Sequence, residues 1–400
     1  MEPTNDAAGR GRVQVPAALT RLLPQTTKAW QAAAVVVVFA ALAIYFDVGS
    51  GGAFVTSENL NLLTRQASVL AVVAAGTTAV MVMGEIDLSI GSAIYLTGLV
   101  AAWADVQWGL PLGVVVLATV VCGILLGAWQ GFLVAVVGMP SFIVTLGGLL
   151  AFQGIGETWS QAASIAPVSG TFANFTEGTI APTAGYVGVG VIGAASIVLI
   201  CLRARRSADH GEPRVWVGAA VRIVTVMACV AVAIWMNRTA FGLPTAALWV
   251  LGVGGILWFL MARSRFGRDA YLIGSNRTAA FHAGISVRGR VFVGFLIAGI
   301  SYGLGGLVLT ARLDGSTATA GMNYELDAIA AAVLGGVSLR GGVGSVPGVL
   351  GGAFLLTLIQ NGMDLTSTST FLQAIVEAAI LIGAVALDSI VRRRTLTSGA

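Results

Sequence analysis

The feature of this sequence that most restricts its fold is a series of long apolar runs separated by short polar gaps. About 12 runs lie between Trp30 and Ile390, and several approach the ~20 residues that an α-helix needs to span a bilayer. Lipid offers the backbone no hydrogen bonds, so such runs fold as helices. Hydrophobic residues make up 56% of the 400 residues and charged residues only 10%. We expect an all-α, polytopic transmembrane domain with about 10–12 spans.

Four of the runs are too short, or too interrupted by glycine, to cross a bilayer as simple helices. They begin at Ile90, Ser141, Ile329 and Val346, and we expect them to be tilted, broken or re-entrant. Between the last two lies the stretch GGVGSVPG at 341–348, whose glycines and proline predict a non-helical turn. Irregular backbone at membrane depth must be satisfied by protein or by a water-filled cavity. This turn is therefore either a loop at the interface or part of a substrate path.

Glycine, with 53 residues, is far more frequent than core packing in a soluble protein requires. In a membrane, small residues let neighbouring helices approach closely. We expect such packing faces at the glycines of 303–306 and at Gly335–Gly336.

The arginines predict the orientation of the chain. Lys28 is the only lysine, and the arginines cluster in the gaps 203–214 and 263–290 and at 392–394. Such clusters mark cytoplasmic loops and not a basic face for nucleic acid. If the runs alternate from a cytoplasmic N-terminus, all three clusters fall inside, and the gap 156–184, which has no Lys or Arg, falls outside.

The expected organisation follows from that path. It consists of a disordered cytoplasmic tail at 1–29, a single transmembrane domain at 30–391 with cytoplasmic loops at 203–214 and 263–290, and a cytoplasmic tail at 392–400.

The sequence lacks the residues that common catalytic sites need. A phosphate-binding P-loop requires a lysine at the end of a glycine-rich stretch, and no such stretch precedes Lys28. The three cysteines and two histidines are too far apart in the sequence to suggest a metal site. We expect that the chain is not an enzyme and holds no cofactor or metal of its own.

The gap 263–290 contains the signals of a short helix. Ser275 or Asn276 can cap its start, residues 278–283 favour helix, and Gly284 can end it. A helix of one or two turns is not stable alone in water. Two interpretations remain open, namely packing against the chain's own membrane domain and docking into a partner.

Two carboxylates, Glu85 and Asp87, interrupt an otherwise apolar stretch, and Glu325 and Asp327 echo their spacing. In one interpretation, Asp87 or Ser89 caps the short helix that begins at Ile90. In a second, both pairs line or gate a polar path between half-helices of duplicated halves. In a third, the acids bind a coupling ion. The first two are compatible with each other.

Further polar residues cluster at the ends of the broken runs and could bind a polar molecule in such a path. They are Asn323, Tyr324, Gln360, Asn361 and Asp364. Capping and loop solvation explain the same residues equally well.

Several motifs occur together in the order typical of one family. They are EIDLSIGS at 85–92, PSFIVTL at 140–146, FGR at 266–268, AA at 279–280, GI at 284–285, ELDAIAA at 325–331 and GGVGSV at 341–346. From about Asn59 to the C-terminus, the chain resembles the membrane-spanning permeases of bacterial ABC sugar importers in the ribose, xylose and arabinose branch. The xylose branch is the most similar, because it shares the additional apolar runs that begin at Gly185 and Val215.

The resemblance implies a permease of the bacterial cytoplasmic (inner) membrane that imports a monosaccharide, D-xylose first. Its implied partners are a second permease copy, a cytoplasmic ATP-binding subunit that binds the ATP, and an extracytoplasmic sugar-binding protein. A stand-alone ion-coupled sugar transporter remains the alternative.

The resemblance also implies roles for particular residues. The helix from Arg277 to Ala283 would couple the permease to the ATPase. Thr278 stands where the family commonly has glutamate, which puts a charge contact from that position in doubt and leaves polar contacts to Arg268, Arg277 or His282. The expected coupling residues are Arg268, Asn276, Arg277, Thr278, Ala279, Ala280, Phe281, His282 and Gly284. The candidates for the translocation path are Glu85, Asp87, Ser89, Asn323, Glu325, Asp327, Gln360 and Asn361.

The roles open to Asp87 can be separated by substitution. Asp87→Ala is expected to impair assembly or transport, because it removes every hydrogen bond of the side chain. Asp87→Asn is expected to be milder if the residue is a cap. An Asn variant that folds normally but transports no sugar would indicate that the charge itself acts.

Overall fold

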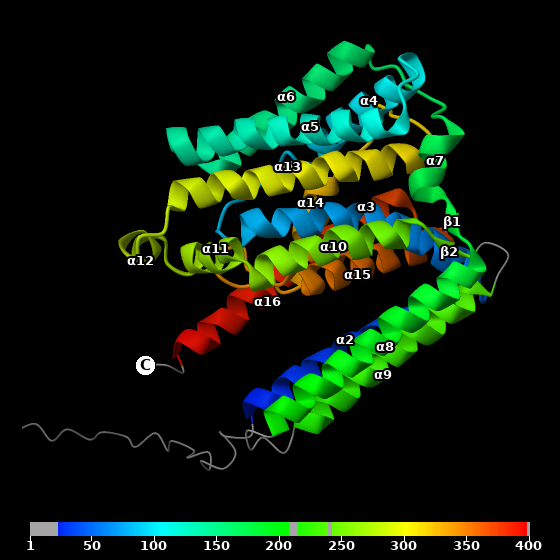
Figure 1. Ribbon diagram of the computed structural model, residues 1–400, viewed down its shortest axis with the longest axis vertical. Helices are drawn as coiled ribbons and strands as arrows, with labels where there is room; N and C mark the ends of the chain where they lie inside the picture. The colour runs from blue at the N-terminus through cyan, green and yellow to red at the C-terminus, as the bar shows by residue number, and fades with distance from the viewer. Residues whose placement is uncertain (1–22, 209–214, 239–241, 398–400) are drawn as a thin grey trace, which may run out of the picture. The chain divides into compact units, whose positions relative to one another are not determined.

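The computed structural model describes residues 23–208, 215–238 and 242–397 (Figure 1). The chain divides into two compact units, Met1–Ala41 with Tyr186–Ile234, and Leu42–Gly185 with Trp235–Ala400. Helices make up most of the described chain, which confirms the all-α class. The strands of the described range are β1 (Thr179–Ile180) and β2 (Leu243–Pro244), which pair antiparallel.

The first unit contains most of α2 (Leu23–Gly49), α8 (Pro182–Ala208) and α9 (Val215–Asn237). In this unit α8 approaches α9 closely, since a Cβ atom on Gly193 would lie 2.7 Å from Val230 Cγ2. Residues 1–22 of the expected tail and 209–214 of the expected loop lie outside the described residues. The remaining parts of that tail and loop are helical, because α2 begins at Leu23 and α8 continues to Ala208.

The second unit contains the other helices. They are α3 (Ser57–Met81), α4 (Ile90–Ala102), η1 (Trp103–Gln107), α5 (Leu112–Gly131), η2 (Phe132–Val137), α6 (Ser141–Ser160), α7 (Gly170–Glu177), α10 (Ala246–Arg263), α11 (Arg265–Ser275), α12 (Arg277–His282), α13 (Val287–Arg312), α14 (Tyr324–Leu334), α15 (Val346–Leu365) and α16 (Thr370–Thr397). Helices α11 and α12 lie at one end of this unit, and α7 with the strands lies at the other (Figure 1). The expected C-terminal tail from 392 is helical as far as Thr397.

Seven helices of the described chain are long and apolar enough to cross a membrane. Two of the four runs expected to be broken are shorter, since α4 has 13 residues and α14 has 11. The runs at Ser141 and Val346 form continuous helices of 20 residues each, so the expected break is wrong for these two runs. The glycines of both runs lie within continuous helix and do not break it.

Helix α13 is the packing centre of the second unit, and its glycines make this possible. A Cβ atom on Gly303 would lie 2.8 Å from the Thr119 carbonyl oxygen of α5, and one on Gly305 would overlap Val73 of α3. A Cβ atom on Gly306 would overlap Thr97 Oγ1 and lie 2.7 Å from the Gly98 nitrogen of α4. The expected packing face is confirmed, and it contacts three different helices.

Gly335 and Gly336 serve different purposes. A Cβ atom on Gly335 would lie 2.5 Å from the Gly348 backbone, so this glycine lets α14 approach α15. Gly336 has a φ of +85° and begins the connection between these helices. Packing is therefore confirmed for Gly335, whereas at Gly336 the left-handed backbone requires the glycine.

The non-helical turn predicted at 341–348 is confirmed for 341–345, whereas residues 346–348 already belong to α15. Gly341 and Gly342 have φ values of +83° and +78°. The Gly342 amide donates to the Val82 carbonyl, 2.8 Å away at the end of α3. Tyr271 Oη of α11 donates to the Gly344 carbonyl at 2.9 Å. Burial raises the pKa of the Tyr271 phenol, so the phenol stays a neutral donor. The turn thus joins α3 to α11.

The close contacts of α13 can be tested with a pair of alanine substitutions. Gly306→Ala is expected to lower the stability of the protein by ~1–3 kcal/mol, the usual range for overpacking, because the new Cβ would overlap α4. Gly255→Ala in α10 is the control, since no atom lies within 4 Å of its Cβ position. The measurement is the apparent melting temperature of each variant in detergent. Equal melting temperatures for both variants would contradict the packing argument.

Candidate functional site

Residues 85–89, the EIDLS segment, lie between α3 and α4 without helical structure. Gly84 directly precedes the segment and has a φ of +80°. The Ile86 amide donates to Ser141 Oγ at 3.2 Å, and the Ile86 carbonyl accepts from Thr145 Oγ1 at 3.3 Å. Two side chains of α6 therefore replace the hydrogen bonds that a helix would have supplied, as buried backbone requires.

Asp87 is fully buried at the centre of a polar cluster. Its Oδ1 accepts from the Ser89 amide at 2.8 Å and from Ser89 Oγ at 2.7 Å, and its Oδ2 accepts from Tyr302 Oη of α13 at 2.9 Å. Ser89 Oγ in turn accepts a hydrogen bond from Gln130 Nε2 of α5. Through these bonds the segment is fixed to α5 and α13.

The capping interpretation holds for the position but not for the hydrogen bond. Ser89 is the N-cap residue of α4, yet its side chain makes no capping bond to the first turn. Asp87 binds the Ser89 amide, which precedes the helix. An amide at position 87 could keep both bonds through its oxygen and donate to Tyr302, whose hydroxyl can also accept.

Glu85 extends from the same segment toward α12. Its Oε1 lies 2.6 Å from Nη1 of Arg277, and the two form an ion pair across 192 residues of sequence. The Glu85 side chain is 9% exposed and that of Arg277 is 53% exposed. The first residue of α12 is thus bound directly to the EIDLS segment, so docking and packing are not exclusive roles for this helix.

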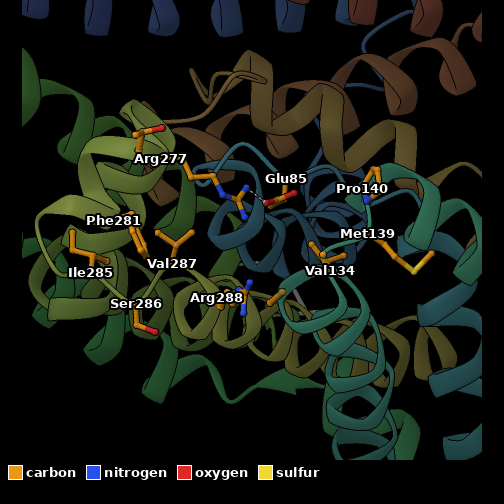
Figure 2. A pocket seen from close by; sticks show the side chains of 13 residues that line it. Glu85, Val134, Met139, Pro140, Arg277, Phe281, Ile285, Ser286, Val287 and Arg288 are labelled. Carbon is orange, nitrogen blue, oxygen red and sulfur yellow. Dashed lines mark hydrogen bonds and ion pairs between the residues drawn. The ribbon is translucent and has the colours of Figure 1, made fainter.

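An open cavity of about 940 Å³ lies beside this ion pair. Figure 2 shows Arg277, Phe281 and Ile285 on one side and Val134, Met139 and Pro140 on the other. The two sides come from α12 with the start of α13, and from the η2–α6 connection. The cavity therefore separates part of α12 from α6.

Helix α12 has the boundaries that the sequence predicts. Asn276 Oδ1 accepts from the Ala279 amide at 2.9 Å, and Gly284 follows the helix with a φ of +80°. Ala280 is buried, whereas the Phe281 side chain is 67% exposed. Thr278, Ala279 and His282 are exposed as well. One side of the helix packs on the chain, and the exposed Phe281 ring lies in the wall of the open cavity.

The rest of the gap 263–290 is more ordered than the sequence suggested. Helix α11 precedes α12, and the sequence reasoning did not predict it. Arg268 is largely exposed and lies 3.5 Å from the neighbouring Asp269. Asp269 also binds Arg290 at 2.8 Å, which joins α11 to α13.

The second acidic pair lies in a different local structure from the first. Glu325 and Asp327 belong to the first turn of α14, whereas Glu85 and Asp87 precede their helix. Asn323, just before α14, has a φ of +67°. A Cβ atom on Gly91 would overlap Glu325 Oε2 and the Gly321 carbonyl, so the starts of α4 and α14 meet. The two motifs are neighbours in space but not equivalent in conformation.

A smaller polar cavity of about 280 Å³ contains Asp327 and Gln360. Gln360 Nε2 donates to Asp327 Oδ2 at 3.2 Å and to Glu377 Oε1 of α16 at 2.9 Å. The full lining is Gln66, Leu70, Arg312, Tyr324, Asp327, Thr357, Gln360, Asp364, Gln373 and Glu377. Asn361 is instead buried against Asn59 of α3, with amide bonds of 2.8 and 3.0 Å.

Sequence reasoning missed several members of these clusters. Tyr302 and Gln130 bind the EIDLS segment, and Arg312 and Glu377 line the smaller cavity. Gln130 and Glu377 are isolated polar residues in apolar runs, which was a usable signal. Tyr302 gave no such signal, because a tyrosine in an apolar helix is ordinary packing.

Known proteins match most of the chain. The family model described as branched-chain amino acid transport system / permease component matches residues 59–248 and 245–385. The xylose transport system permease protein XylH of Haemophilus influenzae is 40% identical over 360 residues, which cover 88% of this chain and 94% of that protein. XylH of Escherichia coli K12 is 38% identical over 359 residues, 89% of this chain and 91% of that one.

More distant relatives carry other sugars in their names. The ribose import permease protein RbsC of Escherichia coli K12 is 32% identical over 337 residues, which cover 84% of this chain and 87% of RbsC. No solved structure matches the chain. The family model and these relatives together show that the chain belongs to the branched-chain amino acid transport system permease family.

Proposed function

We propose that this chain is the membrane-spanning permease subunit of an ATP-binding-cassette importer that carries a monosaccharide, with D-xylose as the first candidate. The observation that supports it most is 40% identity to a xylose permease along nearly the whole of both chains. The exposed face of α12 fits this function, because a permease without a nucleotide site needs a surface for its energy source. The ion-coupled alternative would leave that face without a role.

Three partners belong to this proposal. A cytoplasmic subunit binds and hydrolyses the ATP, an extracytoplasmic protein delivers the sugar, and a second permease copy completes the channel. The contact with the ATPase is assigned to the exposed side chains of α12, above all Phe281, with Thr278 and His282 beside it. An exposed aromatic side chain of this kind is a common anchor in protein interfaces.

The proposed orientation places the α12 end of the second unit in the cytoplasm of a bacterium and both chain termini on the same side of its inner membrane. The arginines of the α11–α13 region support this side, since cytoplasmic segments are rich in Arg and Lys. Helix α7 and the strands then face outward, where the binding protein would dock.

Among the path candidates, Asp327 and Gln360 have the best geometry for a sugar hydroxyl. They line the 280 Å³ cavity, where the Asp327 carboxylate and the amide oxygen of Gln360 can accept from a hydroxyl, while Nε2 of Gln360 donates to Asp327 and Glu377. Ser89 and Asn361 are engaged in bonds that hold helices together. Ser89 and Asn361 are therefore assigned a structural role in the wall of the path. Glu325 lies against Gly91 in the first turn of α4.

Uptake in proteoliposomes tests the function directly. The permease, its ATPase and its binding protein together are expected to accumulate radiolabelled D-xylose only when ATP is enclosed with the ATPase domains. Omitting either partner is the control and is expected to abolish accumulation. Accumulation by the permease alone under a proton or sodium gradient would overturn the proposal in favour of the ion-coupled transporter.

The orientation is tested by labelling single cysteines in a variant without native cysteines. Ser164→Cys precedes α7 and Thr278→Cys lies on α12, and both positions are exposed. In intact cells, a membrane-impermeant maleimide is expected to label position 164, and position 278 only after permeabilisation. The reverse pattern would place α12 outside and exclude its contact with a cytoplasmic ATPase.

A further inference from the structure

We propose that the ion pair of Arg277 and Glu85 transmits movement of α12 to the buried centre of the permease. The inference rests on the proposed function, because it assumes that an ATPase moves α12. It adds to that function a specific connection inside the chain, from the first residue of α12 to the EIDLS segment.

The geometry of the ion pair suits a mechanical connection. At 2.6 Å it is a short, charge-assisted contact, and the Glu85 side chain is nearly buried whereas Arg277 is half exposed. Truncating one member of a buried ion pair leaves the other charge without compensation. A displacement of Arg277 therefore either moves Glu85 with it or leaves the Glu85 carboxylate without its ion-pair partner.

The EIDLS segment is able to pass such a displacement on. Its main chain joins the flanking helices at its two ends, where the Glu85 amide donates to the Val80 carbonyl and the Ser89 carbonyl accepts from the Ala93 amide. Between these ends, its polar groups bind one another and side chains of neighbouring helices. Ile86 binds Ser141 and Thr145 of α6, and Asp87 binds Tyr302 of α13. Ser89, the N-cap of α4, accepts from Gln130 of α5. A shift at Glu85 would thus reach the four helices α4, α5, α6 and α13 within five residues of sequence.

The surroundings of α12 leave room for that displacement. The 940 Å³ cavity lies between Phe281 and Ile285 on one side and Met139 and Pro140 on the other (Figure 2). Closing this space would bring α12 toward the start of α6. The connection to Glu85 lies at the edge of the same cavity, so closure must either carry the ion pair along or break it.

A second ion pair in the same region provides a matched control. Asp269 of α11 and Arg290 of α13 lie 2.8 Å apart, with side chains 10% and 35% exposed. This pair also joins α11 to α13. Among the described residues, no hydrogen bond or ion pair links Asp269 or Arg290 to the EIDLS segment. If ion pairs here only anchor the region, both pairs will behave alike.

The test measures the number of sugars transported per ATP hydrolysed. Replacing a residue with only a structural role would not change this ratio. Reconstituted complexes with Glu85→Gln or Arg277→Gln are expected to keep hydrolysing ATP. They are expected to transport at least ~5-fold less D-xylose per ATP, which is the lower end of typical coupling effects. The double variant is expected to be no worse than either single one, because the residues act as one unit. Arg290→Gln is expected to leave the number of sugars transported per ATP unchanged.

The outcomes separate this inference from the proposed function. If the wild-type complex shows no ATP-driven uptake, the proposed function fails. If it does, and the ratio of sugar to ATP is unchanged in the single variants, or their losses add in the double variant, the connection is refuted. Melting temperatures in detergent identify a misfolded variant. Should Glu85→Gln misfold, Arg277→Gln tests the same connection, since its half-exposed side chain can be replaced without burying a polar group.

Discussion

The glycines of α13, which let three other helices approach it closely, are the constraint on which the second unit depends. Gly299 and Gly303 contact the backbone of α5, and Gly305 and Gly306 bring α3 and α4 to the same helix. Since lipid is as apolar as the helices, association in a membrane relies on close packing rather than on removal of apolar surface from water. The central position of α13 also brings Tyr302 within reach of Asp87.

Close helix packing makes an irregular connection possible at the EIDLS segment. Side chains of α6 bind the Ile86 backbone, and Ser89 with Tyr302 of α13 binds the buried Asp87 carboxylate. In the turn at 341–345, the Gly342 amide donates to the Val82 carbonyl and the Gly344 carbonyl accepts from the Tyr271 hydroxyl. Both irregular stretches therefore depend on tertiary neighbours, and both adjoin the α11–α12 region.

This arrangement unites two features that sequence reasoning treated separately. The acidic motif was a candidate for the sugar path, and α12 was a candidate for contact with an ATPase. The ion pair between Glu85 and Arg277 joins them, while Asp327 and Gln360 line a polar cavity elsewhere. The two residues of the acidic motif thus have different partners. Glu85 contacts α12, whereas Asp87 is buried and binds Tyr302 of α13.

The sequence by itself determined the all-α class, most helix positions and both ends of α12, because hydrophobic runs, caps and glycines act within a few residues. It misjudged the runs at Ser141 and Val346, where glycine weakens a helix but packing retains it, and it did not predict α11. Only the tertiary structure decided which polar side chains meet. Arg277 and Glu85 are 192 residues apart, and no local pattern encodes a contact that arises from how helices pack.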